Sequence, residues 1–317
     1  MSSDPVWLLQ VAFAALADLA FACTLGALLL DAWLRGEQAF APKSPARGSA
    51  RRAARTALAA ALTFVVCDFV SLWLQSAAMS GSPILDAGAT LWLVATATHA
   101  GLGASVAFAG GVLLTIAAAT SSQMRNAHHA HNAHNALAVL GALIAACGKA
   151  AIGHAADAGA FSVAEGVQTL HLLATAVWGG VVIAGAAAVL PALASSVARD
   201  ALMRVVARLS RVATIAVAFV IATGVFNAWR GTGGSPAVIT QSGWGHALAV
   251  KAALVAAALA LGALNRWSAL PRLQRTASTM DAHTVINVMR VEAAVMAGVF
   301  VAASVLSHSV PGFATGG

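Results

Sequence analysis

The sequence has few charged residues for its length. Only 9% of its 317 residues are Asp, Glu, Lys or Arg, whereas 60% are hydrophobic. A soluble domain carries about a quarter charged residues, so this composition excludes a water-soluble globular protein. The hydrophobic residues extend along the whole chain, which also excludes a soluble domain with one anchor. We therefore expect a single integral membrane domain over residues 1–317.

Tyrosine is missing, and the three cysteines (Cys23, Cys67 and Cys147) lie inside hydrophobic runs at unrelated spacings. This excludes tyrosyl chemistry and a disulfide framework, which needs paired cysteines in exposed loops. The chain has no Gly-x-x-x-x-Gly-Lys-Ser/Thr motif and no aspartyl-phosphate motif, so ATP hydrolysis has no support. No Ser–His–Asp order or paired catalytic carboxylates can be argued either. We predict that the protein is not an enzyme.

Eight hydrophobic runs are long enough to cross a bilayer core, which takes about 20 helical residues. They are Val6–Leu34, Thr56–Met79, Ala89–Ala119, Asn135–Ile152, Val163–Leu190, Val205–Trp229, Trp244–Leu264 and Val285–Ser307. The predicted fold class is an all-α bundle of about eight transmembrane helices. The interval from Asp18 to Gly26 matches that from His171 to Gly179, which favours a weak repeat of residues 1–157 and 158–317.

The basic residues predict the orientation. Fifteen of the eighteen Lys and Arg residues lie in or beside four connections, near 35–55, 120–135, 191–204 and 266–284. Lys149 and Lys251 lie within hydrophobic runs, which leaves only Arg230 on the opposite side. The positive-inside rule makes the four basic connections cytoplasmic. We expect both termini in the periplasm of a bacterial inner membrane, with lipid and not nucleic acid as the partner of the basic loops.

Ionisable side chains inside the hydrophobic runs are costly in a bilayer and are candidates for function. Besides the histidines, they are Asp18, Asp68, Lys149 and Lys251. Lys149 lies close enough to a helix end for its ammonium to reach the interface. Lys251 could do the same, or could pair with Asp18, Asp68 or Glu165; we expect a partner inside the bundle.

Histidines gather in the outer half of the predicted bundle. His99 and His171 are expected ~13–16 Å below the outer ends of two different helices, so we predict that they face each other. His154, His246 and His308 lie at outer helix ends, as does Met79.

Imidazole and thioether groups suit copper, so these six residues are the predicted metal ligands. Two alternatives stay open. His99 and His171 at equal depth would also suit axial ligation of haem b, and any single intramembrane histidine could only bridge helices.

A second group of histidines lies on the predicted cytoplasmic side. His128, His129, His131 and His134 fall within ten residues, between Asn126 and Asn135. Histidine-rich tracts can bind copper, zinc or nickel. The spacing matches no defined zinc motif, and a solvated loop of low complexity explains the tract equally well.

Several short motifs, in the correct order, resemble the copper resistance protein D family over about residues 140–310. They are Gly153-His154-Ala-Ala, Leu170-His171-Leu-Leu-Ala-Thr-Ala-Val-Trp178-Gly-Gly180, Trp244-Gly-His-Ala-Leu-Ala-Val-Lys251, Ala263-Leu-Asn265-Arg266-Trp267 with Leu270-Pro271-Arg272-Leu273, and Arg290-Val-Glu292. The residues that carry over from this resemblance are His154, His171, Trp178, Lys251, Asn265, Arg266 and Glu292.

The resemblance implies copper handling at the inner membrane, often beside a periplasmic copper-binding partner of the copper resistance protein C type. We expect transport of copper from the periplasm to the cytoplasm. A haem b electron-transfer protein is the first alternative. A copper-binding membrane partner or sensor that transports nothing is the second.

Overall fold

The computed structural model describes residues 5–37, 44–121, 128–153 and 155–311, and within α5 it does not describe the side chains of residues 128–132. The described residues form helices and turns and contain no strand. Eight helical segments are long and apolar enough to cross a membrane, which confirms the predicted all-α polytopic bundle. The helices are α1 (Pro5–Gly36), α2 (Arg47–Ser80), α3 (Gly88–Ala97), α4 (His99–Thr120), α5 (His128–Ala150), α6 (Val163–Ala184), α7 (Arg199–Gly231), α8 (Val238–Gln241), α9 (Gly243–Leu264), α10 (Leu270–Thr276) and α11 (Thr279–Ser307).

Two of the long segments change helix type near one end. A π-helical turn at Gly185–Val189 continues α6, and a second at Asn265–Ala269 joins α9 to α10. Both turns contact α11. Short π-helical segments occur often at functional sites.

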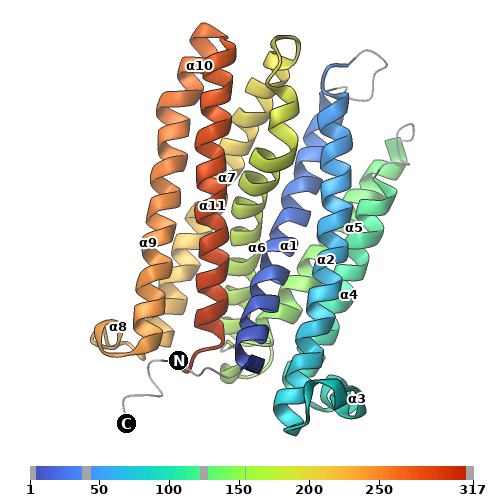
Figure 1. Cartoon of the computed structure of the whole chain (residues 1–317), viewed down its shortest axis with the longest axis vertical. Coiled ribbons are helices and arrows are strands. Elements are labelled where there is room, and N and C mark those ends of the chain that lie inside the picture. The colour runs from blue at the N-terminus through green and yellow to red at the C-terminus, as the bar shows by residue number, and fades with distance from the viewer. Residues whose placement is uncertain (1–4, 38–43, 122–127, 154, 312–317) are drawn as a thin grey trace.

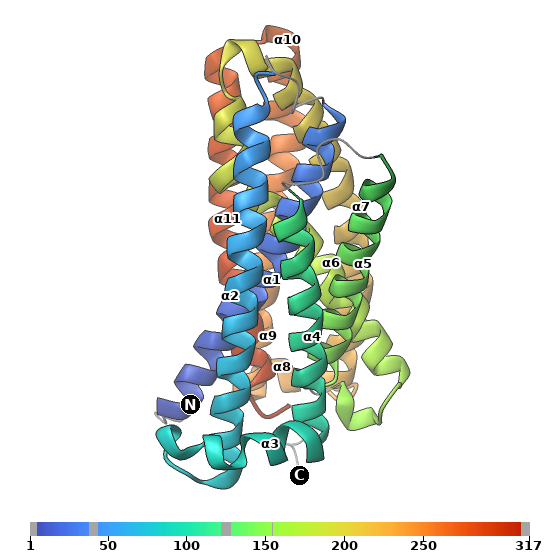
Figure 2. The ribbon, with the colours of Figure 1, turned by 90° about the vertical axis from the view of Figure 1, so that its right-hand side faces the viewer.

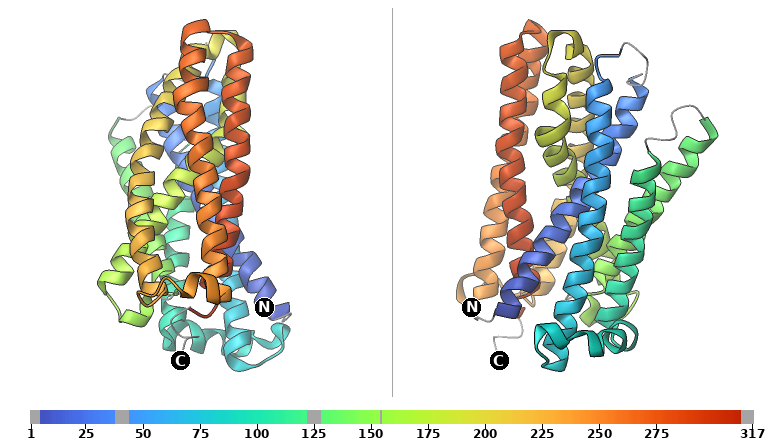
Figure 3. Two further views of the ribbon diagram at one scale, coloured as in Figure 1. Left: turned by 90° about the vertical axis from the view of Figure 1, so that its left-hand side faces the viewer. Right: turned by 45° about the vertical axis from the view of Figure 1, so that its right-hand side comes forward.

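Both ends of the described chain lie at the same end of the bundle, together with the short helices α3 and α8 (Figures 1 and 3). We call this the terminal end. The Trp7 indole donates a hydrogen bond to the carbonyl oxygen of His308 over 3.0 Å, which ties α1 to the residue that follows α11. The arginine-bearing connections lie at the opposite end, which we call the basic end. There Glu37 pairs with Arg204 (2.7 Å) and Arg208 (3.5 Å) of α7.

Helices α1 and α6 form the centre of the bundle, with α4 and α5 on one flank and α9 and α11 on the other (Figures 1 and 2). The central crossing depends on two glycines. A Cβ atom at Gly26 would collide with the backbone of Gly180, and one at Gly180 would collide with the carbonyl of Ala22. Small residues let helix backbones approach closely in membrane bundles, and this close contact fixes how the two halves meet.

The third predicted span proves to be two helices. Thr98 has extended backbone angles (φ −112°, ψ 146°), and its hydroxyl caps α4 by accepting a hydrogen bond from the Gly101 amide over 3.0 Å. Gly101 is needed because a Cβ atom there would collide with the carbonyl of Val94. The predicted span Ala89–Ala119 is therefore wrong in its first third, where α3 forms a separate short helix.

The same construction occurs before α9. Ser242 is extended and accepts a hydrogen bond from the Gly245 amide over 2.9 Å, and a Cβ atom at Gly245 would collide with the carbonyl of Val238. Under the predicted repeat, α4 corresponds to α9 and α3 to α8. The two junctions agree with that correspondence, while the repeat itself stays a prediction.

Candidate functional site

An ion pair joins α1 to α5 inside the bundle. Lys149 Nζ lies 2.9 Å from Asp18 Oδ1, and the two side chains are 13% and 19% exposed. Lys149 also lies over the ring of Phe64, 5.8 Å from its centroid. Asp68 of α2 is buried and interacts electrostatically with both members of the pair. Our expectation that Lys149 reaches the interface was wrong, because the half-buried Asp18 and the buried Asp68 offer its ammonium acidic neighbours inside the bundle.

Lys251 extends this network towards α6. Lys251 lies close enough to Asp18 and to His171 to interact electrostatically with both. The acidic partner that we predicted for Lys251 inside the bundle stays a prediction. Charged and titratable groups from five helices (α1, α2, α5, α6 and α9) are thereby connected through the interior. We call Asp18, Asp68, Lys149, Lys251 and His171 the buried network.

His171 is the histidine of this network, and its orientation is fixed. It is 8% exposed and lies eight residues after the start of α6, about 12 Å along the helix axis. Its Nδ1 atom lies 2.9 Å from the Thr223 hydroxyl of α7. That hydroxyl lies 2.5 Å from the Phe219 carbonyl oxygen, to which it can donate its single proton, and in this arrangement it accepts from Nδ1–H of His171. The lone pair of His171 is then on Nε2, the arrangement that a metal ligand requires.

His99 does not match His171 in depth. Because the helix restarts at Thr98, His99 is the first residue of α4, at the terminal end, and its side chain is half exposed. Its Nε2 atom lies 4.0 Å from Glu165 Oε1, near the start of α6. His171 instead faces Thr223. The prediction that His99 and His171 lie at equal depth and face each other was wrong.

The other predicted outer ligands also lie at the terminal end. His246 and Met79 are exposed, whereas Nδ1 of His308 is 2.9 Å from the Ser304 carbonyl. His154 lies outside the described residues. Within the part of the chain that the structure describes, no three His, Cys, Asp or Glu side chains converge as a metal site.

The histidine tract at the basic end is only partly described. Helix α5 begins at His128, so the tract is helical and the predicted loop 120–135 is shorter than expected. His134 is buried, and its Nδ1 atom lies 3.5 Å from the Thr120 hydroxyl of α4. The side chains of His128, His129 and His131 lie outside the described part of the chain. Their predicted metal binding therefore stays a prediction.

Further polar groups lie along α6 between His171 and the basic end. Thr175 follows one turn later, and its hydroxyl has no hydrogen-bond partner among the described residues. Trp178 is 2% exposed, and its indole donates a hydrogen bond to the carboxylate of Glu292 on α11, which is 4% exposed. Positions spaced by three or four residues share a helix face, so His171, Thr175 and Trp178 form a polar stripe on α6.

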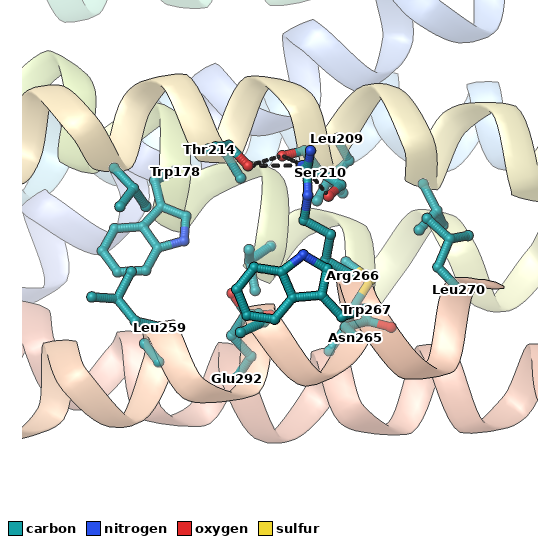
Figure 4. Close-up of a pocket in the computed structure, with 18 residues that line it drawn as sticks. Trp178, Leu209, Ser210, Thr214, Leu259, Asn265, Arg266, Trp267, Leu270 and Glu292 are labelled. Atoms are coloured by element: carbon teal, nitrogen blue, oxygen red, sulfur yellow. Dashed lines mark hydrogen bonds between the residues drawn. The ribbon is translucent and has the colours of Figure 1, made fainter. Parts of the chain in front are cut away.

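The stripe ends at a cavity of about 350 Å³ near the basic end, which Trp178 and Glu292 help to line (Figure 4). Arg266 points away from Glu292 towards α7, where its Nη1 atom donates to the hydroxyls of Thr214 (2.9 Å) and Ser210 (3.0 Å). Asn265 also lines the cavity and is 7% exposed, and its Oδ1 atom has no hydrogen-bond partner among the described residues.

Three features of these sites gave no clear signal in the sequence. Thr223 and Thr175 looked like ordinary helix residues, because one hydroxyl in a hydrophobic run gives no signal until its neighbour is known. Glu292 was carried over only by resemblance, and its contact with Trp178 depends on how α6 meets α11. One signal was available: Trp178, Asn265, Arg266 and Glu292 all belong to the quoted motifs, and all four line one cavity.

Comparison with known families supports the resemblance. The model described as Copper resistance protein D-like, N-terminal domain, matches residues 1–164, and the model described as Copper resistance protein D matches residues 203–306. Comparisons with curated proteins and with solved structures give no match. The first model alone spans more than half of the 317 residues, and the two together span most of the chain. The chain belongs to the copper resistance protein D family.

Proposed function

We propose that this membrane protein transports copper across the inner membrane, from the periplasm to the cytoplasm, with His171 as the ligand inside the bundle. The observation that carries the proposal is the buried network. Two carboxylates, two ammonium groups and an oriented imidazole occupy the interior of an apolar bundle. Such groups are expensive in a membrane and usually mark an ion pathway.

The proposed route starts at the terminal end, where His246, His308 and Met79 offer soft or borderline ligands to an incoming ion. His171 receives copper through Nε2, while Asp18 and Asp68 balance its charge. In the resting state Lys149 and Lys251 neutralise these carboxylates, so a copper ion must compete with resident ammonium groups. Transport past the positively charged lysines then requires that the ion pair Lys149–Asp18 opens.

This orientation puts the terminal end in the periplasm, as the positive-inside rule predicts. A periplasmic copper-binding protein of the copper resistance protein C type is the proposed donor. The polar stripe of Thr175 and Trp178 leads from His171 towards the basic end, which supports onward movement to the cytoplasm.

The test is copper flux into proteoliposomes that contain a copper-sensitive dye. His171→Ala should lower the initial rate about tenfold or more, in the range seen when a metal site loses an interacting group. His283→Ala is the matched control, since His283 is exposed at the start of α11 and belongs to none of the proposed sites. Equal rates for the two variants would contradict the proposed role of His171.

Two further outcomes would decide between the alternatives. Copper binding by the wild-type protein without any flux would favour a partner or sensor. A Soret band in the purified protein that His171→Ala abolishes would favour haem b. The geometry gives the haem alternative less support than the sequence did, because His99 lies beside Glu165, about 9 Å along α6 from His171.

A further inference from the structure

The cations inside the bundle are lysines, although the chain uses arginine at most of its basic positions. The sequence has fifteen arginines and three lysines, which together are its eighteen basic residues. Two of the three lysines, Lys149 and Lys251, belong to the buried network, and no arginine does. An ammonium group can lose its proton when its surroundings change, whereas a guanidinium group stays charged in proteins. The interior therefore holds the kind of cation that can become neutral.

Lys149 is held by carboxylates from two other helices. Its Nζ atom lies 2.9 Å from Asp18 Oδ1, and Asp68 and Cys67 of α2 are close enough to interact with it electrostatically. The other titratable groups on α5 and on its neighbours α4 and α6 are His99, His128, His129, His131, His134, Cys147, Glu165 and His171. Only Glu165 among them is a carboxylate, and it lies beside a histidine at the terminal end. The charge of Lys149 is thus balanced chiefly by Asp18, with Asp68 as the second anion.

The charges of the buried network sum to zero. Asp18 and Asp68 carry two negative charges. Lys149 and Lys251 carry two positive charges. His171, with a proton on Nδ1 alone, is neutral. Uncompensated charge inside an apolar bundle is costly. A Cu(I) ion that enters adds one positive charge, so the network becomes neutral again only if another positive charge leaves.

We propose that the buried network exchanges one Cu(I) ion for one proton, and that Lys149 releases this proton. The proposal rests on the copper transport proposed above and gives it a coupled ion. The Met79 thioether at the terminal end favours Cu(I), the monovalent form. Copper on Nε2 of His171 attracts Asp18, which then no longer balances Lys149. The Nζ–H bond breaks, the proton passes to water and a neutral amine remains, while copper keeps its oxidation state.

The position of the ion pair suits access from the two ends of the bundle in turn. Asp18 lies near the middle of α1, which runs from Pro5 to Gly36. Copper arrives while the network is open to the terminal end, and the proton leaves there. After copper has left at the basic end, Lys149 takes up a proton from that side and the ion pair with Asp18 re-forms. One cycle moves one positive charge in each direction and is electrically neutral.

The transport experiment uses the full-length protein in proteoliposomes, with a Cu(I)-sensitive dye and a pH-sensitive dye in the lumen. The probe is Cu(I), supplied under nitrogen as its acetonitrile complex. Each ion taken up should remove about one proton from the lumen, an acidic lumen should speed uptake, and an imposed membrane potential should leave the rate unchanged. Copper uptake without proton movement, or uptake driven by a membrane potential, would overturn the exchange and leave copper transport standing. No copper uptake at all would refute the proposed transport and the exchange with it.

A binding experiment in detergent tests the proton release without transport. From about pH 7 to about pH 8, above the ordinary pKa of histidine, the affinity of the wild-type protein for Cu(I) should rise about tenfold, because one proton leaves for each ion bound. In weakly buffered solution the same titration should release about one proton per ion bound. A constant affinity or the absence of proton release would overturn the proposal, and neither measurement depends on a variant.

Variants identify the group that releases the proton. Lys149→Arg keeps a positive charge beside Asp18 but cannot deprotonate, so its affinity for Cu(I) should change less than about twofold over the same pH range. Lys43→Arg is the matched control, because Lys43 is the lysine outside the network, and it should behave like the wild type. The double variant Asp18→Asn, Lys149→Met removes the ion pair without leaving an unpaired charge, and it should also release no proton on binding. A proton released by either Lys149 variant would refute the assignment to Lys149.

Discussion

Replacing Lys149 by Met should strongly destabilise the protein. The Lys149 ammonium and the Asp18 carboxylate are 2.9 Å apart and less than one fifth exposed. At an effective dielectric constant of ~20, their attraction is about 6 kcal/mol before the cost of desolvation is subtracted. Lys149→Met leaves the Asp18 carboxylate buried near the second carboxylate of Asp68. Removing one partner of a buried pair costs about 3–5 kcal/mol, and we expect a loss of unfolding free energy in that range.

The measurement is reversible unfolding in mixed micelles, arranged as a double-mutant cycle. The double variant Asp18→Asn, Lys149→Met removes both charges, and it should recover most of the stability, because neutral replacement of a buried pair is often tolerated. Arg272→Met is the matched control, since Arg272 is 63% exposed and 3.9 Å from Asp281. Exposed pairs contribute about 0–1 kcal/mol. If Lys149→Met cost no more than the Arg272 control, the reasoning about a buried network would be refuted.

Three further predictions concern packing, ligand orientation and topology. Gly180→Ala should destabilise the bundle by about 2 kcal/mol or more, because the added Cβ atom collides with α1. Gly166→Ala is the control on the same helix, and it should be neutral or stabilising because its Cβ atom meets open space. Equal unfolding free energies for the two variants would contradict this. Thr223→Val should weaken copper binding by about 10- to 100-fold, because it removes the hydroxyl that orients His171. Thr223→Ser should bind copper like the wild type, because its hydroxyl keeps the hydrogen bond to Nδ1 of His171. A titration in which both variants bind copper equally would exclude the orienting role. A reporter that is active only in the periplasm should be active when fused to the C-terminus and inactive when inserted near residues 36–55, and the reverse pattern would overturn the orientation.

The helices could be predicted because their signal is local. A run of about 20 apolar residues crosses a bilayer as a helix in almost any context. The caps of α6 and α11 are equally local. Ser162 and Ser278 each accept a hydrogen bond from the amide three residues later, at 3.2 Å and 3.0 Å. Helices and caps of this kind can be predicted without knowing which helices pack against them.

The break before α4 shows where hydropathy fails. Residues 89–119 are apolar throughout, so an average over a window gives one span. The break depends on the Thr98 hydroxyl as a cap and on Gly101, which lets the Val94 carbonyl approach. Such signals are clear only when the cap and the glycine are read together. Because the helix break was not recognised, His99 was placed about ten residues too deep in the bundle. That placement led to the incorrect prediction that His99 and His171 face each other.

The candidate sites were predicted in part. Ionisable residues in apolar runs identified Asp18, Asp68, Lys251 and His171, because the cost of burying charge does not depend on the fold. Their partners could not be derived, since the contact of Lys149 with Asp18 requires that α1 and α5 come together at one depth. The cavity could not be predicted from the sequence either, because it results from the spacing between α7 and α9.

The distance between α7 and α9 can be compared with that between their counterparts in the first half of the bundle. If α1, α2, α4 and α5 correspond to α6, α7, α9 and α11, the largest helix contacts in one half have a counterpart in the other. Helix α1 packs on α2 as α6 packs on α7, and α4 packs on α5 as α9 packs on α11. The contacts α5–α6 and α1–α11 also correspond.

Other contacts break the correspondence, and the largest of them is the contact between α2 and α4. Helices α2 and α4 pack closely, whereas their counterparts α7 and α9 stand apart. In the first half Gly111 brings α4 against Phe64 of α2. In the second half the π-helical turn at Asn265–Ala269 carries Arg266, whose hydrogen bonds to Ser210 and Thr214 link the turn to α7 at the basic end. Two helices that could pack on each other instead leave a cavity over a buried carboxylate, although packing would add van der Waals contacts between them. The gap between α7 and α9, which Arg266 bridges and the buried Glu292 lines, therefore distinguishes the second half of the bundle from the first.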